Sequence, residues 1–184
     1  MGTKSEILYD EATIAQAVEE VAQTISNDFR GQDILLVVIL KGAFVFAADL
    51  LRAIERIATQ CNGVASCRVE FMRTSSYGDA QVPGEVKIEL DVGHSLRDQN
   101  VIIVDDVGDT LHTLAHLIAH LQTKGPKTLR TAVLLTKPHR HERADVTLDY
   151  VGIVGDGVGF VVGYGMDDKG LLRGLPYIGE VKND

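Results

Sequence analysis

The side chains best suited to chemistry lie together in residues 101–113, which read VIIVDDVGDTLHT. Two adjacent carboxylates, Asp105 and Asp106, follow a run of β-branched residues, and a third carboxylate, Asp109, precedes the hydroxyl of Thr110. Carboxylates bind sugar hydroxyls or a magnesium ion, and they accept protons. The first N–H groups of a helix, at the positive end of its dipole, bind phosphate. The stretch therefore has groups for both ends of a sugar phosphate.

The elements around this stretch would hold it at the edge of a sheet. Residues 101–104 are consecutive β-branched apolar residues, a pattern typical of a strand buried on both faces. After the polar loop, apolar residues fall at helical spacing: Leu114, Leu117, Ile118 and Leu121. A strand, a polar loop and a helix in this order form a ligand site at the carboxyl edge of a parallel sheet.

Strands and helices alternate along the rest of the chain. We expect helices at residues 10–29 and 43–58, strands at 34–40, 68–72, 86–90 and 129–135, and short β segments among the glycines of 146–181. This alternation predicts an α/β fold with a mainly parallel sheet in a single domain, residues 1–184. Gly and Pro punctuate residues 73–86, which predicts either an ordinary surface loop or a mobile segment over a site. Asp10 could cap the first helix, or Thr13 and Gln16 could form a capping box.

Composition and charge narrow the class of protein. The formal net charge of −8 and the pI near 5.2 argue against general nucleic-acid binding. The longest apolar run, residues 34–40, is too short to span a bilayer, and the N-terminal residues lack the apolar region of a secretory signal. Cys61 and Cys67 are too few and too oddly spaced for a zinc site. We therefore expect a cytoplasmic protein that binds small molecules, without nucleic-acid or membrane partners.

Several short motifs, in order and with consistent spacing, carry a family resemblance: Leu40, Lys41 and Gly42; Arg73 with Ser76 and Tyr77; residues 105–113; Lys137; and residues 160–167. In these motifs the chain resembles the purine phosphoribosyltransferases of the hypoxanthine-guanine type, over nearly its whole length. The resemblance implies a type I phosphoribosyltransferase fold with a small hood formed by the N-terminus and residues 150–184. It also implies a purine-salvage enzyme that moves the 5-phosphoribosyl group of phosphoribosyl pyrophosphate to N9 of hypoxanthine or guanine. The products would be pyrophosphate and inosine or guanosine monophosphate (IMP or GMP), and the cofactor would be Mg²⁺.

The resemblance gives roles to the carboxylates. Asp105 and Asp106 match the acidic pair that holds the ribose hydroxyls while the anomeric carbon gains positive charge. Asp109 matches the residue that handles the proton of the purine's imidazole ring, although it could also cap the following helix. Asp167, together with Asp105 and Asp106, is expected to contact the magnesium ion.

The loop after Asp109 matches the family's 5′-phosphate site with one departure. Thr110, Leu111, His112 and Thr113 occupy the phosphate-binding positions. Leu111 stands where the family often has glycine, which permits a positive φ and a close backbone approach to phosphate. Either φ is negative at Leu111 and its side chain turns outward, or the phosphate pocket is altered. We expect the first, because the threonines and the aspartates are all present.

Other matched positions would surround the leaving group. Lys41 and Gly42 correspond to the family's pyrophosphate-binding loop, and Arg173 corresponds to a residue near the pyrophosphate. Ser76 and Tyr77 would belong to a mobile loop that closes over the reacting centre and excludes water.

The purine itself would meet three residues. Lys137 resembles the lysine that donates to the exocyclic oxygen and so selects 6-oxopurines over adenine. Phe160 would stack on the ring, and the backbone of Val161 would contact the ring edge. The alternative for Phe160 is simple core packing.

Two rival functions remain from the sequence. One is a phosphoribosyltransferase for xanthine or adenine. The other is a regulator that senses phosphoribosyl pyrophosphate without catalysis and binds nucleic acid. The presence of Asp109, Lys137 and Phe160 argues against it, as does the acidic pI. The resemblance also implies a homodimer or homotetramer, with Lys41 and Arg73 near the interface.

Overall fold

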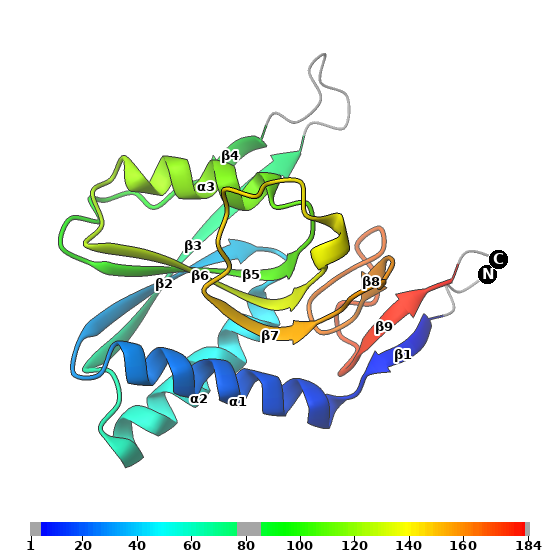
Figure 1. The fold of residues 1–184 in the computed structure, drawn as a ribbon, viewed down its shortest axis with the longest axis horizontal. Coiled ribbons are helices and arrows are strands. Elements are labelled where there is room, and N and C mark those ends of the chain that lie inside the picture. The colour runs from blue at the N-terminus through cyan, green and yellow to red at the C-terminus, as the bar shows by residue number, and fades with distance from the viewer. Residues whose placement is uncertain (1–4, 77–85, 183–184) are drawn as a thin grey trace.

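The computed structural model describes residues 5–76 and 86–182. Within these residues, strands and helices alternate along most of the chain, and the strands form two sheets (Figure 1). The elements are β1 (Ser5–Tyr9), α1 (Glu11–Asp28), β2 (Asp33–Leu40), α2 (Phe44–Cys61), β3 (Ser66–Ser76), β4 (Val86–Leu90), β5 (Asn100–Gly108), α3 (His112–Gln122), β6 (Thr128–Thr136), the 3₁₀ turn η1 (Pro138–Arg140), β7 (Tyr150–Val154), β8 (Val161–Val162) and β9 (Ile178–Val181).

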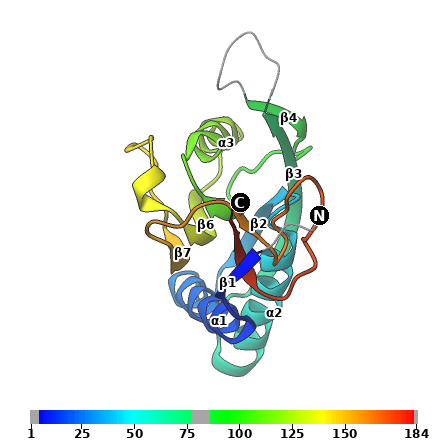
Figure 2. The same cartoon turned by 90° about the vertical axis from the view of Figure 1, so that its right-hand side faces the viewer.

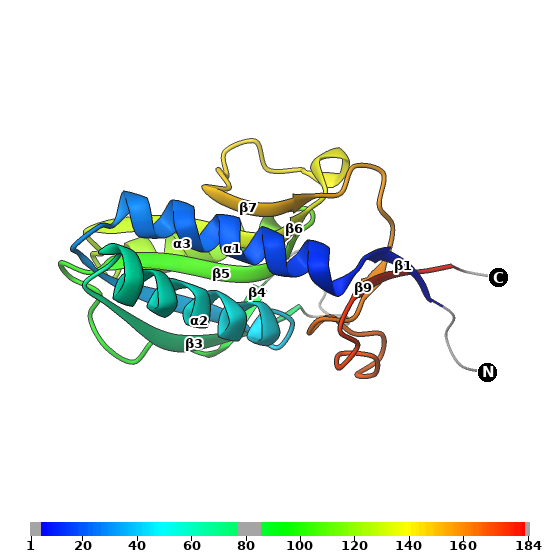
Figure 3. The same cartoon turned by 90° about the horizontal axis from the view of Figure 1, so that it is seen from below.

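The larger sheet has the strand order β4-β3-β2-β5-β6-β7. All its neighbouring strands are parallel except β3 and β4, which are antiparallel. Helices α1 and α2 cover one face, where they lie side by side (Figure 3), and α3 covers the other (Figure 2). The predicted α/β fold with a mainly parallel sheet is confirmed.

Local sequence explains the ends of the first helix. The side chain of Asp10 accepts a hydrogen bond from the backbone N–H of Thr13, so Asp10 is the N-cap. Gln16 instead bonds to Glu20, so the capping-box alternative is not formed. The helix ends at Asp28, shortly before Gly31, where φ is +68°.

Two strands of the larger sheet run further than their apolar residues predict. Strand β3 continues through Arg73–Ser76, because these polar residues pair with β4. Strand β5 continues through Asp105 to Gly108, because it keeps pairing with β6. Residues 73–76 and Val86 are therefore strand and not loop, and the rest of the predicted loop, including Tyr77, lies outside the described residues.

A second sheet, of order β1-β9-β8, joins the two ends of the chain. Its strands are antiparallel, and β1 and β9 lie side by side beyond the end of the larger sheet (Figure 1). Across residues 5–76 and 86–182, no helix combines the length and the apolar character needed to cross a membrane.

Candidate active site

A pocket of about 320 Å³ opens where the carboxyl ends of β2, β5 and β6 meet the segment around β8. In an α/β fold this edge of the sheet is the usual place for a ligand. The described residues that line it are Lys41, Gly42, Asp106, Val107, Asp109, Lys137, Phe160, Val161, Met166, Asp167 and Arg173. Most of the candidate residues from the sequence therefore share one cavity.

The remaining described candidates are not among the residues that line this pocket, and Tyr77 lies outside the described residues. Asp105 is buried next to Asp106. Thr110 and Leu111 directly precede α3, and His112 and Thr113 lie in its first turn. Ser76 is the last residue of β3.

The acidic pair at the end of β5 is held by the backbone. Asp105 Oδ1 accepts from the N–H of Asp106 at 3.0 Å, and Asp106 Oδ1 accepts from the N–H of Val107 at 3.1 Å. Burial, together with the neighbouring Asp106 carboxylate, raises the pKa of Asp105 well above its usual range. A cation at this position would offset the negative charge, and sugar hydroxyls would stabilise the ionised carboxylates by donating hydrogen bonds.

Two glycines allow three segments of the site to meet. A Cβ atom on Gly42 would lie 1.8 Å from Asp106 Oδ2. Gly165 has φ of +102°, and a Cβ atom there would lie 2.2 Å from the carbonyl oxygen of Gly42. The Leu40–Lys41 peptide bond that leads into this contact is cis. The backbone after β2 therefore lies directly against the acidic pair.

Asp109 lies between two cations. Its Oδ2 is 3.6 Å from Lys137 Nζ, and its Oδ1 is 2.5 Å from Arg140 Nε. The Lys137 side chain is buried, and its ammonium donates to the carbonyl oxygen of Gly159. Burial lowers the pKa of Lys137, and the charge of Asp109 partly offsets this. The pocket therefore contains an oriented N–H donor beside a carboxylate.

Phe160 and Val161 also form part of the pocket wall. Val161 is buried in β8, whereas the Phe160 side chain is 56% exposed. Simple core packing of Phe160 is therefore excluded, because more than half of it is open to solvent at the pocket. An exposed aromatic face of this kind is suited to stacking on a flat ring.

Asp167 and Arg173, which both line the pocket, form an ion pair. Arg173 Nη2 is 2.6 Å from Asp167 Oδ1, and Arg173 Nη1 donates to the carbonyl oxygen of Gly165 at 2.6 Å. Asp167 Oδ2 also accepts from the N–H of Gly170. Among the described residues, no group of three or more His, Cys, Asp or Glu side chains is arranged to hold a metal ion unaided.

The start of α3 differs from the expectation for Leu111. This residue has φ of +68° and is 4% exposed, so the predicted negative φ and outward side chain are wrong. The side chain packs into the apolar cluster beneath α3 with Leu114 and Leu117, which stabilises the left-handed backbone that leucine alone disfavours. No side chain caps the N-terminus of α3, and Leu111 rather than Asp109 holds the cap position. The first N–H groups of the helix are thus left for a ligand.

Leu111→Gly should destabilise the protein. Glycine relieves a backbone strain of about 1–2 kcal/mol, but loss of a buried leucine side chain costs about 2–5 kcal/mol. We expect a net fall in the free energy of unfolding of roughly 1–3 kcal/mol, measured by urea denaturation. Leu111→Ala, which loses the burial and keeps the strain, should be less stable still. A stabilised Leu111→Gly variant would show that the strain outweighs the packing.

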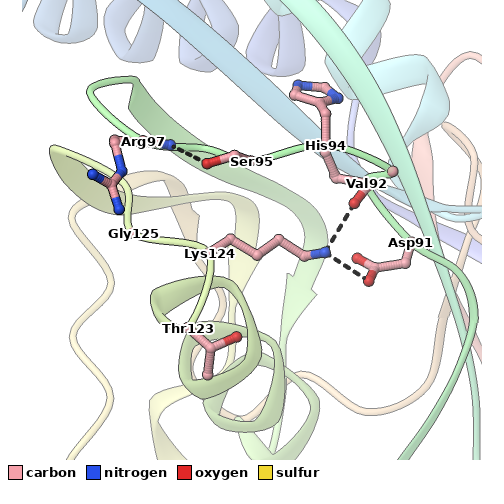
Figure 4. Close-up of a pocket in the computed structure, with 9 residues that line it drawn as sticks. Asp91, Val92, His94, Ser95, Arg97, Thr123, Lys124 and Gly125 are labelled. Atoms are coloured by element: carbon pink, nitrogen blue, oxygen red, sulfur yellow. Dashed lines mark hydrogen bonds and ion pairs between the residues drawn. The ribbon is translucent and has the colours of Figure 1, made fainter.

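A larger cavity, of about 560 Å³, lies away from these groups (Figure 4). It is formed by residues 91–97, which lead into β5, and by the end of α3. Its lysine, Lys124, donates to the carbonyl oxygen of Val92 and pairs with Asp91, each at 2.9 Å. None of the candidate residues from the sequence lines this cavity. Size alone therefore does not identify the site, and the chemistry of the lining does.

Comparison with known families agrees with this geometry. The phosphoribosyl transferase domain family matches residues 4–169, which is most of the chain. The chain belongs to the phosphoribosyltransferase family.

Relatives within the family are similar over nearly their whole length. A hypoxanthine-guanine phosphoribosyltransferase of Dictyostelium discoideum is 36% identical, covering 97% of this chain and 96% of the relative. One of Staphylococcus aureus strain Mu50 is 37% identical, covering 96% and 93% respectively. The crystal structure of a hypoxanthine-guanine phosphoribosyltransferase from Bacillus anthracis superposes with a TM-score of 0.85 at 36% identity, covering 99% of this chain and all of that one.

The structure also shows a residue that the sequence analysis missed. Arg140, in η1, makes the shortest contact of the Asp109 carboxylate. Its only signal in the sequence is its place three residues after Lys137 in a basic turn. Such a turn resembles an ordinary solvated loop until its partner is known.

Proposed function

We propose that this chain is a purine-salvage transferase that moves the 5-phosphoribosyl group from phosphoribosyl pyrophosphate to N9 of hypoxanthine or guanine. The products are IMP or GMP and pyrophosphate. The observation that carries the proposal is the buried ammonium of Lys137 beside the carboxylate of Asp109, in a pocket walled by Phe160. The relatives from Dictyostelium discoideum and Staphylococcus aureus, both hypoxanthine-guanine phosphoribosyltransferases, support the same bases.

The chemistry follows from these side chains. Asp105 and Asp106 hold the ribose hydroxyls and stabilise the positive charge that the sugar gains as pyrophosphate leaves. When the purine binds, the Lys137 ammonium releases the carbonyl oxygen of Gly159 and donates its hydrogen bond to the 6-oxygen of the purine. As N9 bonds to the anomeric carbon, Asp109 takes the proton that the imidazole ring must lose.

The phosphate groups have separate sites. The 5′-phosphate is bound by the first N–H groups of α3 with the hydroxyls of Thr110 and Thr113. Pyrophosphate leaves near Lys41 and Arg173, whose cations offset its charge.

The site also suits a magnesium ion. Asp105, Asp106 and Asp167 offer the hard oxygen ligands that Mg²⁺ prefers, and Mg²⁺ commonly binds one or two carboxylates together with substrate phosphates. The burial of Asp105 beside the Asp106 carboxylate fits this, because a nearby cation would favour the ionised form of two adjacent acids. When bound, the ion neutralises charge on the pyrophosphate.

Gly42→Ala should damage the part of the pocket where the backbone after β2 meets the acidic pair. The added methyl group would displace the Asp106 carboxylate, because the two would stand 1.8 Å apart. We expect KM for phosphoribosyl pyrophosphate to rise about tenfold or more, since overpacking costs about 1–3 kcal/mol. Gly93→Ala is the control, because a Cβ atom there meets nothing within 4 Å. An unchanged KM in Gly42→Ala would mean that Asp106 does not hold the ribose.

A spectrophotometric screen tests the proposal as a whole. The protein is given phosphoribosyl pyrophosphate, magnesium and one of hypoxanthine, guanine, xanthine or adenine. Turnover restricted to hypoxanthine and guanine supports the proposal. Turnover with xanthine or adenine instead would mean that the acceptor base is a different purine. A folded protein that binds phosphoribosyl pyrophosphate but turns over no base would instead be a regulator.

The assembly and location of the enzyme belong to the same proposal. We propose a single catalytic domain hooded by the small sheet, which works in the cytoplasm as a homodimer or homotetramer. Large apolar side chains near the expected interface are about half exposed, namely Phe44 at 45% and Phe71 at 46%. Light scattering measures the molar mass of the protein in solution. A monomer at every concentration would contradict the proposed homodimer or homotetramer.

A further inference from the structure

The turn after β6 brings a guanidinium against the carboxylate of Asp109. Arg140 donates from Nε to Asp109 Oδ1 at 2.5 Å, on the side away from Lys137, which lies 3.6 Å from Oδ2. Among the described residues that line the pocket, Asp109 and Lys137 are present and Arg140 is not. Arg140 therefore reaches the carboxylate from outside the space that a purine would fill.

Backbone contacts on both sides of this ion pair fix the turn against the loop before α3. The N–H of Lys137 donates to the carbonyl oxygen of Gly108 at 2.9 Å. The N–H of Glu142 donates to the carbonyl oxygen of Thr110 at 3.2 Å. The two segments are thus joined immediately before and after the ion pair, which fixes where the guanidinium stands relative to the carboxylate.

We propose that Arg140 is a positioning residue for the transfer reaction: it holds Oδ1 of Asp109 so that Oδ2 faces the purine. This inference rests on the proposed function. A guanidinium–carboxylate hydrogen bond is short and directional, so it fixes orientation as well as charge. A carboxylate already held at one oxygen needs little reorganisation to take a proton at the other.

A second arginine in the same region provides a matched comparison. Arg143 contacts Asp145 at 2.8 Å and 2.7 Å, an ion pair similar in chemistry. Neither of these residues is among the described residues that line the pocket. Removal of Arg143 therefore tests what the loss of an exposed arginine costs by itself.

The experiment measures kcat and KM for IMP formation in purified full-length variants with intact circular dichroism spectra. We expect Arg140→Ala to lower kcat about tenfold or more, part of the roughly 10²–10⁴-fold that a positioned acid–base group supplies, with KM for phosphoribosyl pyrophosphate within about twofold. Arg140→Lys, which retains a cation without the fork of donors, should recover part of the loss. Arg143→Ala should stay within about twofold of the wild type.

The decisive comparison adds Arg140→Ala to an Asp109→Asn background. If Arg140 acts through Asp109, Arg140→Ala should lower kcat by a large factor in the wild type but by little in the Asp109→Asn background. An equal loss in both backgrounds, or a wild-type kcat in Arg140→Ala, would overturn the inference. A variant too unstable to assay as alanine is replaced by Arg140→Gln under the same criteria. If the wild type forms no IMP or GMP, the proposed function fails, whereas an active wild type with an unaffected Arg140→Ala rejects the inference alone.

Discussion

Asp109→Asn is expected to lower kcat by about 100- to 1,000-fold while KM for both substrates stays within a few fold. Positioned acid–base groups contribute about 10²–10⁴-fold, and asparagine cannot take up the proton of the purine. Its side-chain oxygen has the same reach and can still accept from Arg140, so the pocket should keep its shape. Steady-state kinetics with hypoxanthine as substrate would measure the change.

The control for this substitution is the same change outside the pocket. Asp145→Asn removes a carboxylate that pairs with Arg143, and it should leave kcat within about twofold, because exposed ion pairs contribute little. A kcat within about fivefold of the wild type for Asp109→Asn would contradict the role of Asp109. A large rise in KM with unchanged kcat would assign it to binding instead.

Lys137→Met should lower kcat/KM for hypoxanthine by about 10- to 100-fold with little effect on KM for phosphoribosyl pyrophosphate. Methionine fills a similar volume but cannot donate, and a hydrogen bond from a charged group is worth about 1.5–3 kcal/mol, with each 1.4 kcal/mol equal to a factor of ten. The carbonyl oxygen of Gly159 also loses this donor. The preference for hypoxanthine over adenine should shrink accordingly.

A second lysine allows a matched control. Lys124 also donates to a backbone carbonyl, that of Val92, and pairs with a carboxylate, but in the larger cavity (Figure 4). Lys124→Met should leave kcat/KM for hypoxanthine within about twofold. Equal losses in the two variants would mean that Lys137 contributes to stability and not to recognition of the purine.

Much of the architecture could be predicted from short-range patterns. The apolar run at residues 34–40 predicts a buried strand, and the structure has one at Asp33–Leu40. Asp10 caps α1, and it is one of two caps that the sequence offers, because capping is a local side-chain contact. The strand, loop and helix order at residues 101–121 likewise predicts that polar residues gather at the carboxyl edge of the sheet.

The parts that could not be predicted depend on distant partners. Arg73–Ser76 are polar, and they are strand only because β4 pairs with them. The left-handed backbone of Leu111 is stabilised by an apolar cluster that includes Leu148 and Val146, which follow it at a distance along the chain. Arg140 became a candidate only when folding placed it against Asp109.

A crystal structure with IMP bound tests most directly whether the pocket between β5, β6 and β8 binds the purine nucleotide. We expect the 6-oxygen of the purine about 2.7–3.2 Å from Lys137 Nζ, with the ring against Phe160 and the ribose over Asp105 and Asp106. Lys137 would then have released the Gly159 carbonyl. IMP bound in another cavity, or bound here with the ammonium of Lys137 still on that carbonyl, would contradict this role of the pocket.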